Sequence, residues 1–182
     1  AISFVGAGVI WRFVYDFRPQ LGVINAVLDG LLPNYRPIGW LVNPRTATAA
    51  LILIFIWMWT GFAMVILSAA LKGIPKEILE AARTDGANAW QTFWYIQVPM
   101  VASTIGVVTT TVIIFVLKVF DLVYVMTAGR YDTNVMANQM YRELYVIRHF
   151  GRSSAIAVIL LLAITPMMFI NIRRFREQEA LR

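Results

Sequence analysis

ATAALILIFIWMWTGFAMVILSAAL, residues 47–71, is a stretch without a single charged side chain. A helix needs about 20 predominantly apolar residues to cross the hydrocarbon core of a membrane. The stretch therefore predicts a transmembrane helix. Two further charge-free stretches, Val98–Leu117 and Ser153–Ile172, support the same interpretation. A fourth apolar segment, Ala1–Val14, is short for a full span.

The composition of the whole chain agrees with a membrane protein. Of the 182 residues, 59% are hydrophobic and 14% are charged, whereas soluble domains average about 25% charged residues. We therefore predict an all-α, polytopic transmembrane helical bundle. The alternative, a soluble protein with very apolar core helices, would need several such helices in one short chain, so we disfavour it.

The residue inventory excludes several kinds of site. Cysteine is absent and His149 is the single histidine, so a thiolate site, a histidine cluster and a cysteine nucleophile are excluded. The net charge of +6 does not indicate nucleic-acid binding, because Lys and Arg lie between apolar stretches, as membrane-flanking anchors do. They are divided almost equally between the two sides, so they do not decide the orientation. We predict no metal and no cofactor.

The start of the chain has neither a basic region nor a cleavage site for a signal peptide. We therefore expect that it begins inside a helix and that the chain is N-terminally truncated. Prolines break the first connection, Tyr15–Thr46, which leaves room for a short helix over about Leu21–Leu32.

The connection Met126–Arg152 contains an amphipathic pattern. We expect a helix that starts at Asp132-Thr133-Asn134, ends at Gly151 and lies on the membrane surface or against the spans. Lys118 and Asp121, three residues apart, are expected on one face of a helix, where they can pair.

The second connection, Lys72–Gln97, interrupts the apolar chain with the charged sequence EILEAARTDGA, residues 77–87. Pro75 suits the first turn of a helix, and Gly86 permits a sharp turn before a second helix at about Ala89–Tyr95. Small residues would form a knob edged by the charges of Glu80 and Asp85. From the residues alone, a docking knob and an ordinary interfacial loop remain equally open.

This connection resembles the EAA loop of binding-protein-dependent ABC transporter permeases. The matching residues are Glu80-Ala81-Ala82, Asp85-Gly86-Ala87, Phe93, Ile96 and Pro99, and Val98 stands where Leu is usual. The resemblance extends over essentially the whole chain. KVFDLVYVMTAGR, residues 118–130, and YDTNVMANQMYREL, residues 131–144, resemble the carbohydrate-uptake branch, close to maltose and alpha-glucoside permeases. Ala128-Gly129-Arg130 departs from the usual Gly-Gly-Pro.

The resemblance implies a single transmembrane permease domain over residues 1–182, with a cytoplasmic coupling loop at residues 75–97. The implied function is sugar import, of an oligosaccharide or alpha-glucoside, in a bacterial or archaeal plasma or inner membrane. Six residues would dock an ATPase subunit: Glu80, Ala81, Ala82, Asp85, Gly86 and Ala87.

The implied partners are an ATPase subunit pair, a second homologous permease subunit, a periplasmic or lipid-anchored sugar-binding protein and membrane lipid. The chain itself is not expected to be an enzyme, because it has no phosphate-binding loop for ATP. The family's substrate path corresponds here to seven positions: Ser3, Trp59, Thr60, Gly61, Phe115, Val116 and Val119. Each of these positions could instead face lipid or pack between helices.

Other transport functions remain alternatives. The EAA loop is shared with permeases for amino acids and phosphate, so another solute class is possible on this resemblance. A standalone channel or secondary carrier would need polar or ionisable groups along its spans, and these spans offer mostly Thr and Ser. Nothing in the sequence supports a membrane enzyme.

Overall fold

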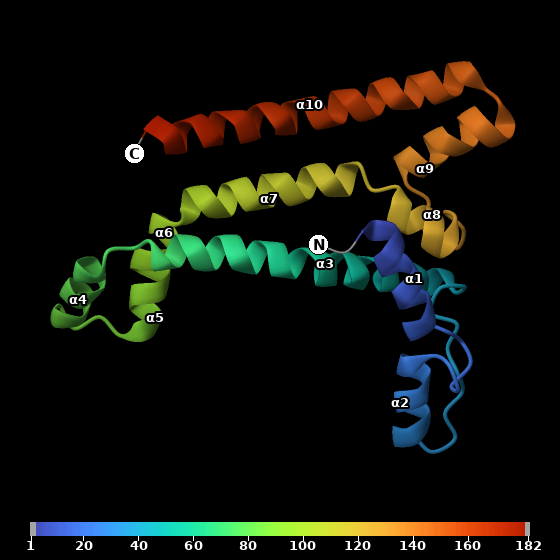
Figure 1. The fold of residues 1–182 in the computed structure, drawn as a ribbon, viewed down its shortest axis with the longest axis horizontal. Coiled ribbons are helices and arrows are strands. Elements are labelled where there is room, and N and C mark those ends of the chain that lie inside the picture. Colours follow the sequence, from blue (N-terminus) through green and yellow to red (C-terminus); the bar gives the residue numbers. More distant parts are fainter. Residues whose placement is uncertain (1–2, 181–182) are drawn as a thin grey trace. The chain divides into compact units, whose positions relative to one another are not determined.

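The computed structural model describes residues 3–180. The described chain consists of helices joined by turns and loops, without a strand, which confirms the predicted all-α class (Figure 1). It divides into two compact units. Unit 1 comprises the residues up to Met58 together with Leu117–Leu162, and unit 2 comprises Trp59–Val116 together with the residues from Ala163 onward.

Two long helices confirm two of the predicted spans. Helix α3 (Pro44–Lys72) contains the charge-free stretch of 25 residues, and α10 (Phe150–Ala180) contains Ser153–Ile172. Both are long and apolar enough to cross a membrane, with mean hydropathies of 2.4 and 2.3 over their most apolar windows. Each helix contributes one part to unit 1 and another to unit 2.

The prediction of one uninterrupted span over Val98–Leu117 is wrong. Consecutive helical segments cover this region: α5 (Ala89–Thr92), η1 (Phe93–Gln97), α6 (Val98–Met100) and α7 (Ala102–Leu117). The axis bends by 68° at Val101, between α6 and α7. Pro99 contributes to the break because it has no N–H to donate to the preceding turn. The bent pair can still make one broken span.

Unit 1 contains several short helices besides the first part of α3. They are α1 (Phe4–Val14), α2 (Val23–Leu31), α8 (Asp121–Thr127), α9 (Met136–Tyr141) and the π-helix η2 (Arg142–Ile147). Helix α2 confirms the helix predicted over Leu21–Leu32. Helix α1 packs against α8, and Gly8 permits this approach, since a Cβ there would lie 3.1 Å from a methyl of Val125. Ile54 and Leu122 are fully buried in the core of this unit.

Asn25 fixes the loop between α1 and α3. Its side chain is 0% exposed, and its Nδ2 lies 2.9–3.2 Å from the carbonyl oxygens of Asp16, Phe17 and Ile38. Its Oδ1 accepts hydrogen bonds from the Tyr35 hydroxyl at 2.6 Å, the Ile38 N–H at 3.1 Å and the Trp40 Nε1 at 3.2 Å. One buried amide on α2 therefore holds the irregular segments that precede and follow this helix.

The predicted start and the predicted end of the helix in the connection Met126–Arg152 are both wrong. Helix α9 starts after Val135, because Asp132 adopts a left-handed conformation, with a φ of 59°, and Thr133 is used in side-chain hydrogen bonds. The π-helix η2, which continues α9, ends at Ile147 before the left-handed Arg148, whereas Gly151 lies inside α10.

Lys118 and Asp121 do not share a helix face. Helix α7 ends at Leu117 and α8 begins at Asp121, so Lys118 lies in neither helix. No ion pair joins them in the described residues.

Candidate functional site

Helix α4 (Lys76–Thr84) follows Pro75 in unit 2 and ends in a hydrogen-bonded glycine turn. The N–H of Gly86 donates to the carbonyl of Arg83, and the N–H of Ala87 donates to the carbonyl of Ala82, both at 3.0 Å. These two bonds define a Schellman motif. Gly86 has a φ of +82°, which strains residues with a Cβ, so the turn requires glycine at this position.

A second capping motif begins the next helix immediately afterwards. The Asn88 side chain accepts from the N–H of Gln91, and the Gln91 side chain accepts from the N–H of Asn88, each at 2.9 Å. This reciprocal pair is a capping box. Only Ala87 separates Gly86 from Asn88, so the connection between α4 and α5 is fixed at both ends. We call residues 76–92 the coupling element.

The coupling element exposes most of the residues predicted to dock an ATPase. Glu80, Ala81, Asp85 and Gly86 are exposed, whereas Ala87 is half-buried. Ala82 is only 5% exposed, so in this structure it packs inside the element. Of the predicted docking residues, Glu80 and Ala81 on α4 and Asp85 and Gly86 in the glycine turn are therefore the ones accessible to a partner.

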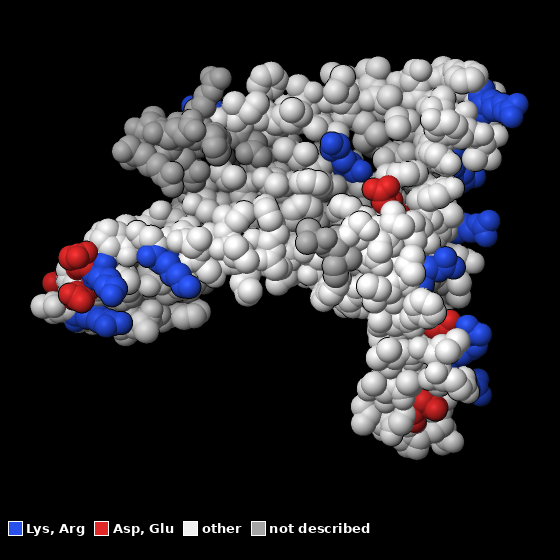
Figure 2. Space-filling view, in the orientation of Figure 1, with Lys and Arg blue, Asp and Glu red and all other residues white. Residues whose placement is uncertain are grey.

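The charges of α4 have no ion partner within the described chain. Figure 2 shows blue and red atoms gathered around this helix. The charged residues of α4 and its C-terminal cap are Lys76, Glu77, Glu80, Arg83 and Asp85. The hydroxyl of Thr84 donates to the backbone carbonyl of Glu80 at 3.0 Å and leaves the Glu80 carboxylate exposed. These charges are accessible to a charged partner.

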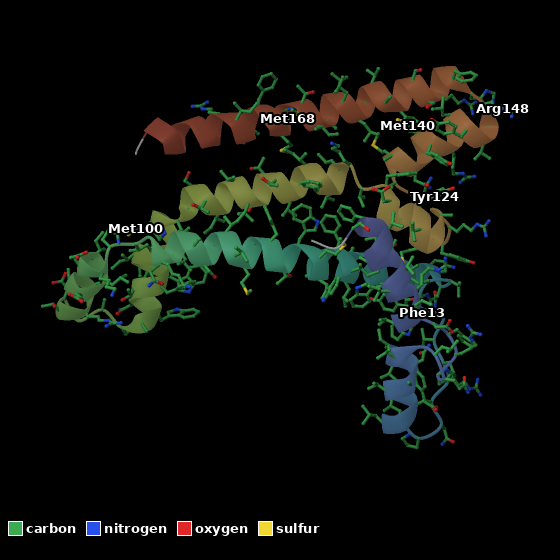
Figure 3. The ribbon with its side chains drawn as sticks, in the orientation of Figure 1. Phe13, Met100, Tyr124, Met140, Arg148 and Met168 are labelled. Carbon is green, nitrogen blue, oxygen red and sulfur yellow. The ribbon has the colours of Figure 1, made fainter. Side chains whose placement is uncertain are left out.

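Aromatic side chains lie at the end of the coupling element, in α5, and directly after it, in η1. Trp90, Trp94 and Tyr95 are exposed, and Trp90, Phe93 and Trp94 contact one another with ring centroids 5.2–6.4 Å apart. Trp and Tyr favour the boundary between membrane and water. This aromatic group is suited to hold the coupling element at that boundary, beside the bend that leads into α7 (Met100 is labelled in Figure 3).

Unit 2 brings two of the predicted substrate-path residues together. The rings of Trp59 on α3 and Phe115 on α7 have centroids 4.5 Å apart, and Phe62 packs edge-on against Trp59 at 5.2 Å. Phe115 and Val116 are partly exposed, and Thr60 and Gly61 are exposed. Trp59 and Phe115 thus form an aromatic pair.

The other two predicted path residues belong to unit 1 and have structural contacts there. The Ser3 hydroxyl caps α1 by accepting from the N–H of Gly6 at 3.0 Å. Val119 packs against the buried core of that unit. Their role in a substrate path stays a prediction.

Sequence reasoning missed a chain of side-chain hydrogen bonds along α9 and η2. Asn138 donates to Asn134 at 2.7 Å, Asn134 donates to Gln139 at 2.8 Å, and Gln139 donates to Glu143 at 2.9 Å. Asn138 and Glu143 are buried. Gly129 must lack a side chain, because a Cβ there would collide with Asn138 and Asn134. The sequence signal for these bonds was the four-residue spacing of polar side chains such as Gln139 and Glu143, which places them on one side of a helix.

Comparison with known proteins gives a consistent result. The chain matches the family model "Binding-protein-dependent transport system inner membrane component" over residues 3–172. It is 58% identical to the osmoprotective compounds uptake permease protein GgtC of Synechocystis sp., over 100% of this chain and 66% of that protein. It is 49% identical to the alpha-glucoside transport system permease protein AglF of Rhizobium meliloti, over 98% of this chain and 54% of that protein.

A solved structure supports the same assignment. The chain resembles a chain of the bacterial alginate ABC transporter in complex with an alginate pentasaccharide-bound periplasmic protein, with a TM-score of 0.79 and 26% identity. The match covers 93% of this chain and 59% of that chain. This chain thus spans between about half and two thirds of the proteins it matches. It belongs to the family of inner membrane components of binding-protein-dependent transport systems.

Proposed function

We propose that this chain is part of the permease subunit of an ATP-driven sugar importer, and that its coupling element docks a separate ATPase subunit. The observation that carries the proposal is the coupling element itself. A glycine turn and a capping box fix its shape, while Glu80 and Asp85 remain exposed and without an ion partner in the described residues. A fixed shape with accessible charge is suited to complementary docking.

The proposed docking places the coupling element in the cytoplasm. The segments Tyr15–Thr46 and Met126–Arg152 then face the periplasm or the cell exterior, where a sugar-binding protein delivers its cargo. Closure of the ATPase pair around ATP moves α4, and the attached spans rock against a second permease subunit. The chain contributes the lever and part of the path, and ATP hydrolysis takes place in the ATPase.

The substrate class we propose is an alpha-glucoside or a related oligosaccharide. The relative AglF is named for alpha-glucosides, and the similar solved transporter was captured with an oligosaccharide-bound periplasmic protein. The ring pair of Trp59 and Phe115 supports this class, because flat apolar ring faces suit the C–H faces of sugar rings. GgtC, named for osmoprotective compounds, makes a compatible glycoside solute the second candidate.

The docking proposal is tested by charge reversal in the full-length permease. Glu80→Lys places a cation where we expect a basic surface of the ATPase, and Glu77→Lys makes the same change on the same exposed helix outside the predicted docking residues. Loss of a paired charge and addition of a like charge costs about 2 kcal/mol or more at an interface. We expect about a 30-fold weaker association with the ATPase for Glu80→Lys.

Co-purification from detergent measures this association, and uptake of labelled sucrose, trehalose and maltose by cells measures transport. We expect Glu80→Lys to lose the ATPase and uptake, and Glu77→Lys to keep both. Equal binding of the ATPase by both variants contradicts docking through Glu80. Uptake of none of the three sugars by the wild type contradicts the alpha-glucoside class.

A further inference from the structure

Four aromatic rings of unit 1 gather on α8 and α9 and on the residues that flank them. They are Phe120, Tyr124, Tyr141 and Tyr145, and we call them the tyrosine cluster. Phe120, Tyr124 and Tyr141 contact one another with ring centroids 5.1–5.3 Å apart. Tyr145 continues from Tyr141 at 4.9 Å. Segments more than a dozen residues apart in the sequence thus join in one aromatic surface.

The cluster is not part of the buried core. Tyr145 is 65% exposed and Tyr124 is 43% exposed, and Phe120 and Tyr141 are half-buried. Tyr124 is labelled on α8 in Figure 3. Rings that only fill a core bury their faces, whereas these rings keep part of their faces accessible.

The hydroxyl group of Tyr141 has a raised pKa and is therefore neutral at physiological pH. A hydrogen bond with Tyr124 is the main cause that raises the pKa of Tyr141, and nearby Tyr145 contributes. Each neutral phenol both donates and accepts one or more hydrogen bonds. The surface therefore combines apolar ring faces with neutral hydroxyl groups and contains no charge of its own.

The side-chain hydrogen bonds that link Asn134, Asn138, Gln139 and Glu143 hold α9 and η2 in position. Gln139 donates to the buried carboxylate of Glu143, on either side of Tyr141 in the sequence. The N–H of His149 donates to the carbonyl of Glu143 at 2.8 Å and closes the π-helix that carries Tyr145. Single π-helical turns are frequent at functional sites. These contacts fix the helix turns from which Tyr141 and Tyr145 project.

We infer that the tyrosine cluster is a sugar-contacting surface of the permease on the side that receives cargo, an inference that rests on the proposed function. Sugars present C–H faces and a rim of neutral hydroxyl groups, which apolar rings and phenols match together. Phe120 directly follows Val119, a candidate path residue. Tyr141 and Tyr145 belong to the segment Met126–Arg152, which the proposed orientation puts on the side that receives cargo. The competing interpretation is that the four rings form part of an aromatic belt that contacts only lipid headgroups.

The test uses the full-length permease assembled with its ATPase, second permease and binding protein in proteoliposomes. Uptake of sucrose, trehalose and maltose is measured for Tyr124→Ala and Tyr145→Ala, and ATPase activity is measured in parallel. A sugar contact differs between sugars of different shape, so we expect the ratio of uptake rates among them to change about threefold or more. Tyr145→Phe keeps the ring and should give a smaller change.

Phe150→Ala is the matched control, because Phe150 is also strongly exposed in unit 1 and belongs to none of the ring pairs of the described chain. It should leave the ratio unchanged. An equal reduction for all three sugars, or no change in the tyrosine variants, overturns the inference and favours a packing or lipid-facing role. A wild type that imports none of the sugars overturns the proposed function, and this inference with it.

Discussion

The coupling element and the loop around Asn25 both interrupt apolar helices, but they use polar side chains differently. Asn25 is fully buried, and six hydrogen-bond contacts converge on it. Glu80 and Asp85 are exposed and join no ion pair within the described chain. In the coupling element the backbone turn and caps fix the shape, so its side-chain charges remain available for a partner. In the Asn25 loop the side chain itself fixes the shape.

The largest effect is expected where the side chain fixes the shape. Asn25→Ala would leave the half-buried groups of Tyr35, Ile38 and Trp40 without their acceptor and the carbonyl groups of Asp16, Phe17 and Ile38 without their donor. Because each unsatisfied buried polar group costs about 1–3 kcal/mol, we expect a loss of about 3–5 kcal/mol in stability. Thermal unfolding of the detergent-solubilised, full-length permease measures it.

Asn43→Ala serves as the control for this loss. The Asn43 side chain is exposed and accepts from the N–H of Arg45 at 3.0 Å at the start of α3. Its removal should cost about 1 kcal/mol, as loss of a cap does. Similar melting temperatures for the two variants would show that the buried amide does not organise the loop.

A smaller, local effect is expected where the backbone fixes the shape. A Cβ at Gly86 would meet no atom within 4 Å, and the same is true of Gly30 in α2, but only Gly86 has a positive φ. Gly86→Ala should therefore strain the turn by about 1–2 kcal/mol, whereas Gly30→Ala should be neutral or stabilising. We expect Gly86→Ala to remain in the membrane with reduced uptake, and a bulkier residue to abolish coupling.

Membrane content and sugar uptake, measured in the same cells, separate these outcomes. Normal uptake by a membrane-inserted Gly86→Val variant would show that the glycine turn is dispensable for coupling. Absence of the Gly30→Ala variant from the membrane would show that open space around a glycine does not predict whether this chain tolerates an alanine there.

The smallest effect concerns the exposed ion pair beside the Asn25 loop. Hydrogen bonds from Arg18 lower the pKa of Asp16 from 3.8 to about 2. A carboxyl with a lowered pKa stabilises the fold above its ordinary pKa, and this contribution is lost as the pH falls through about 2. The Arg18 side chain is exposed and the Asp16 side chain is only half-buried, so the contribution is small. Arg18→Gln should slightly reduce the melting temperature at neutral pH and make no difference near pH 2.

An equal change in melting temperature at both pH values would contradict a role for the charged pair. The measurement also sharpens the comparison between the regions. It asks whether an exposed charge stabilises this protein when its partner is on the same chain, in contrast with Glu80, whose partner we place on another subunit.

The sequence predicts well what depends on local pattern. The charge-free stretch within α3 and the end of α4 at Gly86 follow from hydrophobic length and from a glycine turn, and both are present. The 68° bend at Val101 was missed because the apolar pattern continues without interruption through Pro99. Hydrophobicity indicates the length of chain that a membrane can accommodate, but it does not indicate where the helix axis bends.

Contacts between distant segments were not accessible to the same reasoning. The contacts of Asn25 come from residues 8–15 positions away in an irregular loop, where no period indicates pairing. The tyrosine cluster joins α8 to α9 in the same way. For the predicted docking residues, the sequence identified the exposed acids but not the burial of Ala82, which depends on how the turn folds back on α4.

The single residue between the Schellman turn and the capping box has a mechanical consequence. A flexible linker would absorb a displacement of α4 as slack before α5 moved. Here Gly86 and Asn88 are each held by hydrogen bonds, and Ala87 alone lies between them. In the docking that we propose, a displacement of α4 by an ATPase would pass to α5 with little slack, because the joint between the two helices is a single residue held on both sides.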